Sequence, residues 1–217
     1  MPFDRRTLLA AFAFIVLSAT SAAADDLPSR IDPPLADPTP AALAKAGPLG
    51  DMSMGDDKAP VTLIAYLSLT SPLSAHFSEA VLPELKTRYI ATKKLRFILR
   101  EFPFDPRDTT GFVIARCVGK DKFFPAIETL FAKQAEWSGR KATKTLQDVL
   151  KPFGVTEKSF ADCLANEKLF DHVRDVKAAA AHFNVHATPA FFVNGKRLVG
   201  DQSTDKLAKA IETAAPK

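Results

Sequence analysis

The sequence predicts an α/β fold in which a βαβ unit and a C-terminal ββα unit enclose an all-helical insert. An apolar, β-prone run at residues 61–67 leads through a short polar loop into an amphipathic helical pattern over residues 74–90. Apolar and polar residues alternate again at residues 94–102, as a strand requires. Near the C-terminus, Asn194-Gly195 separates two apolar runs, a strong hairpin signal. The βαβ order implies a parallel pair with a right-handed crossover.

Composition sets broad limits on function. The 217 residues are 47% hydrophobic, enough to bury a core of one to two domains. The net charge of +4 is mild, and Lys and Arg are scattered among acids, which favours a solvated surface over a nucleic-acid interface. The four histidines are dispersed along the chain, so we predict neither a metal site nor a cofactor.

The first 24 residues read as a secretory signal peptide. Arg5 and Arg6 precede an apolar run over residues 8–17, and Ala22-Ala23-Ala24 offers a cleavage site. This segment is too short and wrongly flanked for a membrane anchor, and no later stretch could span a bilayer. We therefore expect an exported protein without stable membrane insertion. The twin arginine leaves both the Sec and the twin-arginine export routes open.

Residues 25–54 are predicted to be a proline-rich, flexible lead. Prolines recur through this segment, large apolar side chains are few, and such a composition favours extended conformations that bury little. Its last part, around residues 49–54, is expected to pair as a short edge strand before the turn at Gly55.

Helical periodicity occupies residues 105–183, where we expect five helices that form a lid domain. Thr156 is the expected N-cap of the fourth. The apolar positions are Val113, Ile114, Cys117 and Val118; Phe124, Ile127, Leu130 and Phe131; Leu146, Val149 and Leu150; Phe160, Cys163 and Leu164; and, for the last helix, the span 170–183.

After the insert, a strand, the hairpin and a helix over residues 204–214 close the chain. Without the insert the order is β-α-β followed by β-β-α, which is the order of the thioredoxin fold. We assign the thioredoxin domain to residues 55–104 and 184–215.

The loop before the central helix is the candidate site. Ser71 is a predicted N-cap, and backbone N–H groups and the positive end of the helix dipole converge on it. In thioredoxin-type proteins this helix start carries a C-x-x-C motif, because it stabilises a thiolate. Here Ser71, Pro72, Leu73 and Ser74 occupy these positions. The site has the architecture of a redox centre and lacks its sulfur.

Several other stretches, between about residue 50 and residue 212, match the sequence pattern of one known protein family. The matching stretches are GDDKAPVT at 55–62, AHFSEAVLPELKTRY at 75–89, FILREFP at 97–103, ARC at 115–117, KFF at 122–124 and VHATPAFFVNGK at 185–196. The chain resembles the DsbA family of periplasmic thiol-disulfide oxidoreductases, particularly its shorter alphaproteobacterial type. The resemblance implies a periplasmic location and a cis proline at Pro189 that faces the site.

The sequence departs from this family where the chemistry should be. The family motif is C-P-H-C, so both sulfurs and the central histidine are missing, and Ala65 stands where relatives often carry a buried glutamate. A serine hydroxyl is protonated at neutral pH and cannot form a disulfide, which excludes dithiol exchange at this loop. The chain resembles a degenerate member of the family.

Cys117 and Cys163 are the only cysteines. An exported protein with two cysteines is expected to join them, and matching cysteines form a non-catalytic bridge in the helical domain of the DsbA family. A displaced redox pair is the alternative, although these two lack C-x-x-C spacing and a position at a helix start.

Four readings remain open for the function of this chain. The family holds extended substrate peptides against the residue before the cis proline, here Thr188, which implies a non-redox binder of unfolded or extended exported polypeptides. Kappa-class glutathione transferases carry a Ser-Pro-Tyr-Ser-like motif that resembles residues 71–74, and would use Ser71 to bind a glutathione thiolate. The third reading is a relic in which Ser71 is only an N-cap. A retained family role in disulfide formation by other means also stays open.

Overall fold

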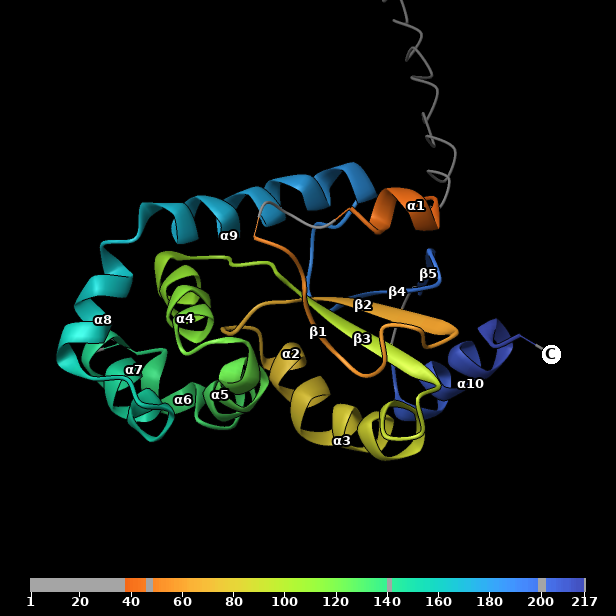
Figure 1. Ribbon diagram of the computed structural model, residues 1–217, viewed down its shortest axis with the longest axis horizontal. Helices are drawn as coiled ribbons and strands as arrows, with labels where there is room; N and C mark the ends of the chain where they lie inside the picture. Colours follow the sequence, from red (N-terminus) through yellow and green to blue (C-terminus); the bar gives the residue numbers. More distant parts are fainter. Residues whose placement is uncertain (1–37, 46–48, 140–141, 199–201, 217) are drawn as a thin grey trace, which may run out of the picture. The chain divides into compact units, whose positions relative to one another are not determined.

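The computed structural model describes residues 38–45, 49–139, 142–198 and 202–216, all within one compact unit. The predicted signal peptide and the lead up to residue 37 lie outside the described residues. In the described part, five strands form a sheet in the order β1-β3-β2-β4-β5 (Figure 1). They are β1 (Met52–Met54), β2 (Val61–Leu67), β3 (Leu95–Glu101), β4 (Ala190–Val193) and β5 (Lys196–Leu198).

The strand pairing confirms the predicted topology. β2 runs parallel to β3, from the pair Val61–Leu95 to the pair Leu67–Glu101, while β4 joins the other side of β2 antiparallel. Asn194 and Gly195 both have positive φ, 46° and 90°, as the type I′ turn between β4 and β5 requires. The C-terminal helix α10 spans Thr204–Ala214.

The central helix begins at Pro72 and is not uniformly α-helical. It consists of α2 (Pro72–His76), a π-helical turn (Phe77–Val81), α3 (Leu82–Leu85) and a second π-helical turn (Lys86–Ile90). Pro83 accounts for the first irregularity, because its ring removes one N–H donor and crowds the carbonyl four residues before it.

Each face of the sheet has its own apolar cluster because successive side chains of a strand point to opposite faces. Leu63, Ala65 and Leu67 of β2 face the central helix, the insert and α10. Ile64 and Tyr66 face the other way, toward α1 (Pro40–Leu43) and the end of α9 (Glu167–Ala180). Figure 1 shows α1 and α9 on one side of the sheet and α2, α3 and α10 on the other.

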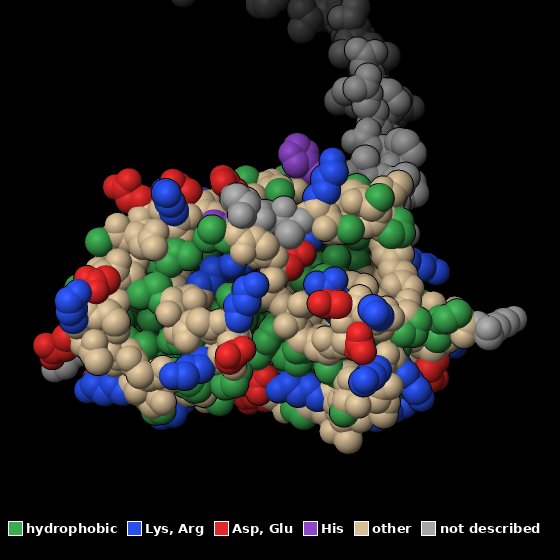
Figure 2. All heavy atoms as spheres, in the orientation of Figure 1, with side chains coloured by type: hydrophobic (Ala, Val, Ile, Leu, Met, Phe, Trp, Pro, Cys, Tyr) green, Lys and Arg blue, Asp and Glu red, His purple; other side chains and the backbone are tan. Residues whose placement is uncertain are grey.

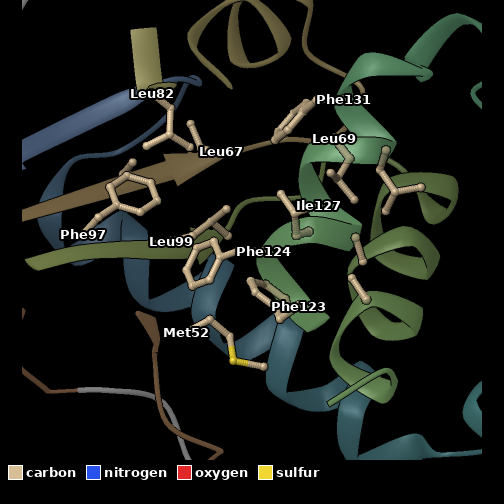
Figure 3. Packing of buried hydrophobic residues seen from close by; sticks show 14 of the residues in the cluster. Met52, Leu67, Leu69, Leu82, Phe97, Leu99, Phe123, Phe124, Ile127 and Phe131 are labelled. Carbon is tan, nitrogen blue, oxygen red and sulfur yellow. The ribbon is translucent and has the colours of Figure 1, made fainter. Parts of the chain in front are cut away.

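The insert shares the main core with the sheet. Figure 3 shows side chains of β3 and of α5 (Lys120–Ala132) facing each other, and the rings of Phe97 and Phe124 lie 6.0 Å apart. The five predicted helices are confirmed as α4 (Pro106–Cys117), α5, α7 (Ala142–Leu150), α8 (Glu157–Leu164) and α9. Within the insert, the short helix α6 (Gln134–Trp137) was not predicted. Thr156 caps α8 as expected, accepting a hydrogen bond from Ser159 N.

The described part of the lead is folded against the sheet, contrary to the flexible conformation that its composition favours. Leu43 of α1 is buried, and its carbonyl accepts a hydrogen bond of 2.6 Å from Arg100 of β3. The same guanidinium pairs with Asp51 at 2.9 Å. Met52 pairs with Leu99 in the predicted edge strand. Tertiary contacts from β3 therefore override the local preference of this proline-rich segment.

Cys117, the last residue of α4, and Cys163 of α8 form a disulfide with their Cα atoms 6.3 Å apart.

Acidic and basic side chains are interspersed over the face shown in Figure 2. No helix of the described residues is long and apolar enough to cross a membrane.

Candidate functional site

The serine loop adopts the predicted cap. Ser71 has extended backbone angles, φ −84° and ψ 120°, and its Oγ accepts a hydrogen bond of 3.2 Å from Ser74 N. Pro72 occupies the first helical turn, where no N–H is needed. The start of α2 follows the end of β2. It lies at the end of the sheet where the parallel strands β2 and β3 have their carboxyl termini.

The structure brings Thr188 and Pro189 to this loop. The Ser71 hydroxyl lies 3.4 Å from the Thr188 carbonyl oxygen, to which it donates. β4 begins at Ala190, opposite Tyr66 near the end of β2, so the loop before it must end beside Ser71. The Thr188–Pro189 peptide bond is cis. Among the described residues, nothing accepts a hydrogen bond from the buried Thr188 hydroxyl.

The four motif residues divide into two pairs. The side chains of Ser71 and Ser74 are buried and serve the loop itself, since Ser74 Oγ accepts a hydrogen bond of 3.4 Å from Ser68 N. Pro72 and Leu73 are exposed, and the Leu73 side chain is 66% accessible. The loop thus presents an apolar surface to solvent and keeps its hydroxyls inside.

A buried carboxylate beneath the loop was not predicted from the sequence. Asp108, in the first turn of α4, accepts hydrogen bonds from Leu69 N at 2.8 Å and from Phe104 N at 3.0 Å. It also accepts from the hydroxyls of Ser68 at 2.5 Å and Thr70 at 3.2 Å. Burial raises the pKa of Asp108 above its ordinary value, while these donors act against the shift. Asp108 joins the serine loop to the insert.

A second connection comes from α6. The side-chain amide of Gln134 donates to the carbonyl oxygens of Leu69, at 2.8 Å, and Ser71, at 3.1 Å. No pattern in the sequence indicated that Gln134 would bind the serine loop, because the short helix that carries it was not predicted. The only available signal for Asp108 was the Asp-Pro-x-x start of α4, which indicates helix capping alone.

Comparison with known proteins places the chain in a family. Residues 48–213 match the family model described as thioredoxin. The chain belongs to this thioredoxin family. Among curated thioredoxin-family relatives, a protein of Rickettsia conorii named as a protein-disulfide oxidoreductase is 30% identical over 171 residues, which cover 76% of this chain and 60% of the relative. The chain therefore spans about 60% of the length of the curated relatives it matches first.

Solved structures agree on the thioredoxin fold. Alpha-DsbA1 of Wolbachia pipientis superposes with a TM-score of 0.73 at 24% identity, over 80% of this chain and 94% of that one. A protein-disulfide isomerase of Novosphingobium aromaticivorans gives a TM-score of 0.69 at 24% identity, over 78% and 98% of the two chains. BdbD of Bacillus subtilis gives 0.68 at 22% identity, over 76% and 92%.

Within the thioredoxin-family fold, sulfur lies away from the serine loop. Both cysteines of the chain are in the disulfide between α4 and α8, and hydroxyls occupy positions 71 and 74. Ala65 is fully buried and pairs with Leu99 and Phe191 across the sheet, so apolar groups fill the place of the glutamate that the DsbA resemblance implies.

Within the described residues, no group of three or more potential metal ligands lies together. His186, the histidine nearest in sequence to Thr188, is exposed, and its Nε2 lies 2.7 Å from the Asn184 side-chain oxygen.

Proposed function

We propose that this thioredoxin-family protein binds extended polypeptides at the serine loop without exchanging disulfides with them. The bound chain lies along the backbone of Thr188, between Pro189 and the start of α2, as an added strand. Its partners are unfolded or extended exported polypeptides, and the protein acts on them in the periplasm after removal of the signal peptide.

The backbone of Thr188 is the observation that carries this proposal. Ser71 holds the Thr188 carbonyl, and the Thr188 N–H donates to no other described residue. A main-chain group that the fold leaves unpaired can bond to a bound chain. An extended chain that lies along Thr188 pairs with it through main-chain hydrogen bonds, the basis of strand addition.

The exposed Leu73 supports an apolar contact beside this strand. Leu73 lies at the start of a capped helix and is 66% accessible, so most of its apolar surface faces solvent. Covering such a side chain with a partner's apolar group removes both surfaces from water, a favourable change of about 25 cal/mol per Å². In the DsbA motif a histidine stands here, so the substitution by leucine exchanges a group that tunes a thiolate for one that binds apolar surface.

The residues at positions 71 and 74 support the proposed absence of exchange. Exchange needs a thiolate that attacks and a second sulfur that resolves the mixed disulfide. Both hydroxyls are engaged in hydrogen bonds of the loop, and the one cystine of the chain joins two helices of the insert.

The glutathione-binding alternative has less support from the geometry. A kappa-class-like site would have the Ser71 hydroxyl donate to a thiolate, but this hydroxyl already donates to the Thr188 carbonyl. Leu73 also replaces the aromatic residue of that motif.

Isothermal titration with an extended, cysteine-free peptide tests the proposal without altering the protein. In an added strand the Thr188 N–H donates to a peptide carbonyl, and a peptide N–H donates to the second lone pair of the Thr188 carbonyl. Methylating that peptide nitrogen should weaken binding roughly tenfold, since one main-chain hydrogen bond is lost. Methylating the next nitrogen, which points away in an added strand, should have little effect. Scanning the methyl group along the peptide therefore gives an alternating pattern.

Leu73→Asp should lower the affinity for the same peptide by about fivefold or more, because the apolar contact is lost. Leu164→Asp is the matched control, as Leu164 is exposed on α8. Uniform sensitivity to methylation, or equal effects of the two variants, would argue against strand addition at Thr188. Glutathione binding that Ser71→Ala abolishes would favour the kappa-class alternative.

A further inference from the structure

A groove lies between the loop that follows β3 and helix α9, apart from the serine loop. Its volume is about 390 Å³, and its lining includes Pro103, Phe104, Pro106 and Thr109 on one side and Phe170 and Lys177 on the other. Phe104 is 51% accessible, an uncommon exposure for an aromatic side chain that has no partner outside the fold.

Two aromatic rings and one cation form a cluster at this groove: Phe104 and Lys177 line it, and the buried Phe102 contacts both. The rings of Phe102 and Phe104 meet edge to face, with centroids 5.5 Å apart. The Lys177 ammonium lies 5.5 Å from the Phe102 centroid and 5.9 Å from that of Phe104. No described carboxylate forms an ion pair with Lys177. Its positive charge is held over an apolar surface and is not neutralised.

The other charges around the groove are already paired. Arg174 pairs with Asp171 at 2.5 Å, and Asp105 pairs with Arg107 at 2.5 Å while it also caps α4. Asp105 therefore does not neutralise Lys177. The groove combines an accessible aromatic face with a single unpaired cation, and its complement is an apolar ring next to a carboxylate.

We propose that this groove is a second contact surface, which binds an aromatic side chain of an extended partner polypeptide together with the carboxylate of an adjacent acidic residue. The partner's ring packs against Phe104 between Pro103 and Phe170. The carboxylate pairs with Lys177, where the nearby rings exclude part of the water that screens exposed ion pairs.

The groove and the serine loop are separate surfaces with a shared support. The Asp108 carboxylate binds Phe104 N in the wall of the groove and Leu69 N in the serine loop. Phe102 N in turn donates to Leu67 O at the end of β2. Both surfaces therefore lie at the C-terminal end of β2 and β3. Binding of a peptide to each surface can be measured separately.

NMR titration of the full, ¹⁵N-labelled mature protein tests the proposal with defined probes. Acetyl-Gly-Phe-Asp-Gly-amide should shift the amides of Phe104, Thr109 and Lys177 and bind at least about threefold more tightly than the Phe-Lys or Ala-Asp analogues. Lys177→Glu should abolish or reverse the preference for Asp over Lys. The control Lys168→Glu changes an exposed lysine of the same helix and should preserve it.

The resonances also separate this proposal from the function proposed for Thr188. Shifts confined to residues 70–74 and 188–190 would support strand addition and overturn the groove as a contact surface. Equal affinity of the Asp and Lys peptides, or an unchanged preference in Lys177→Glu, would also overturn it. Shifts of the groove amides that grow with protein concentration alone would overturn it in favour of a second copy of this chain.

Discussion

At the scale of single residues, Asp108 does the most to hold the candidate site in place. Its carboxylate accepts from the buried Leu69 N and the partly buried Phe104 N, which belong to loops after two different strands. A buried N–H without an acceptor costs free energy. A side chain at position 108 that can accept from these N–H groups therefore stabilises the fold. The residue also faces Ser68 and Thr70, whose hydroxyls donate to the same oxygen.

We predict that Asp108→Ala lowers the free energy of unfolding by about 3 kcal/mol, because both main-chain donors lose their acceptor. Urea denaturation of the mature protein measures this change. Asp162→Ala removes an exposed carboxylate that pairs with Lys158 within α8, and its effect should stay below about 0.5 kcal/mol. Similar losses in the two variants would contradict the role assigned to Asp108.

We predict that His172 makes the free energy of unfolding depend on pH. Its buried ring accepts a hydrogen bond of 3.2 Å from Leu49 N through Nδ1, so the ring is neutral, and Nε2 has no partner among the described residues. Burial lowers the pKa of His172 below 6.5, and Arg116 lowers it further against the opposing effect of Glu101, Asp175 and Asp51.

The direction of the pH dependence follows from this lowered pKa of His172. As the pH falls below about 6.5, the unfolded chain binds a proton that the folded chain resists, so the free energy of unfolding falls. Urea denaturation between about pH 5 and pH 8 should give a slope that His172→Gln reduces by up to about 1.4 kcal/mol per pH unit. His186→Gln, which changes an exposed ring, is the control. An unaltered slope in His172→Gln would show that this ring titrates alike in both states.

At the scale of elements, the short helix α6 couples the insert to the serine loop. Gln134 binds the carbonyls of Leu69 and Ser71, and the Trp137 indole next to it donates to Leu130 O at 2.7 Å, which fixes α6 on α5. We predict that Gln134→Ala speeds amide hydrogen exchange over residues 68–74 at least fivefold, as two hydrogen bonds of about 1 kcal/mol each are lost. Mass spectrometry of that peptide measures it, with residues 190–198 as internal control. Unchanged exchange would exclude this coupling.

The disulfide joins α4 and α8 across 46 residues of sequence. We predict that the mature protein, denatured without reductant, has no free thiol, and that the double variant Cys117→Ser, Cys163→Ser loses about 4 kcal/mol of stability. Its affinity for peptides at the serine loop should not change, since the bridge lies in the insert. Thiol titration and urea denaturation check the first two statements. A loss of peptide binding in the variant would instead link this cystine to the site.

The elements show where sequence patterns suffice and where they do not. The strand at 61–67, the hairpin at Asn194-Gly195 and helix 204–214 follow local rules of periodicity and turn chemistry, and the structure confirms them. α1 and α6 were not predicted, because four residues carry too little periodicity and their conformation depends on contacts made far away in sequence.

In the candidate site, too, some residues could be predicted from the sequence and others could not. Ser71 was predicted as a cap from the residues after it, and the contact with Thr188 from the DsbA resemblance. Asp108 and Gln134 lie 34 and more residues from the loop they support, and their roles depend on tertiary packing that no local pattern encodes.

At the scale of the whole molecule, the serine loop lies at the C-terminal end of the parallel strands β2 and β3, with serine and not cysteine at positions 71 and 74. The fold places a helix N-terminus, the Thr188 backbone and an exposed leucine together, and the insert braces them through Asp108 and Gln134. The proposed function is that this arrangement binds main chain, which needs no thiol. The central claim is that the protein binds polypeptides at the serine loop and does not oxidise them.

Oxidation of a dithiol peptide, followed by the loss of its free thiols, tests this claim most directly. The unaltered protein should bind the peptide and oxidise it no faster than buffer. The variant Ser71→Cys, Ser74→Cys should gain oxidant activity, because the start of α2 favours a thiolate. The gain should stay limited, since Leu73 and Ala65 supply neither a histidine nor a carboxylate. Robust oxidation of the peptide by the unaltered protein would contradict the account and identify the Cys117–Cys163 pair as catalytic.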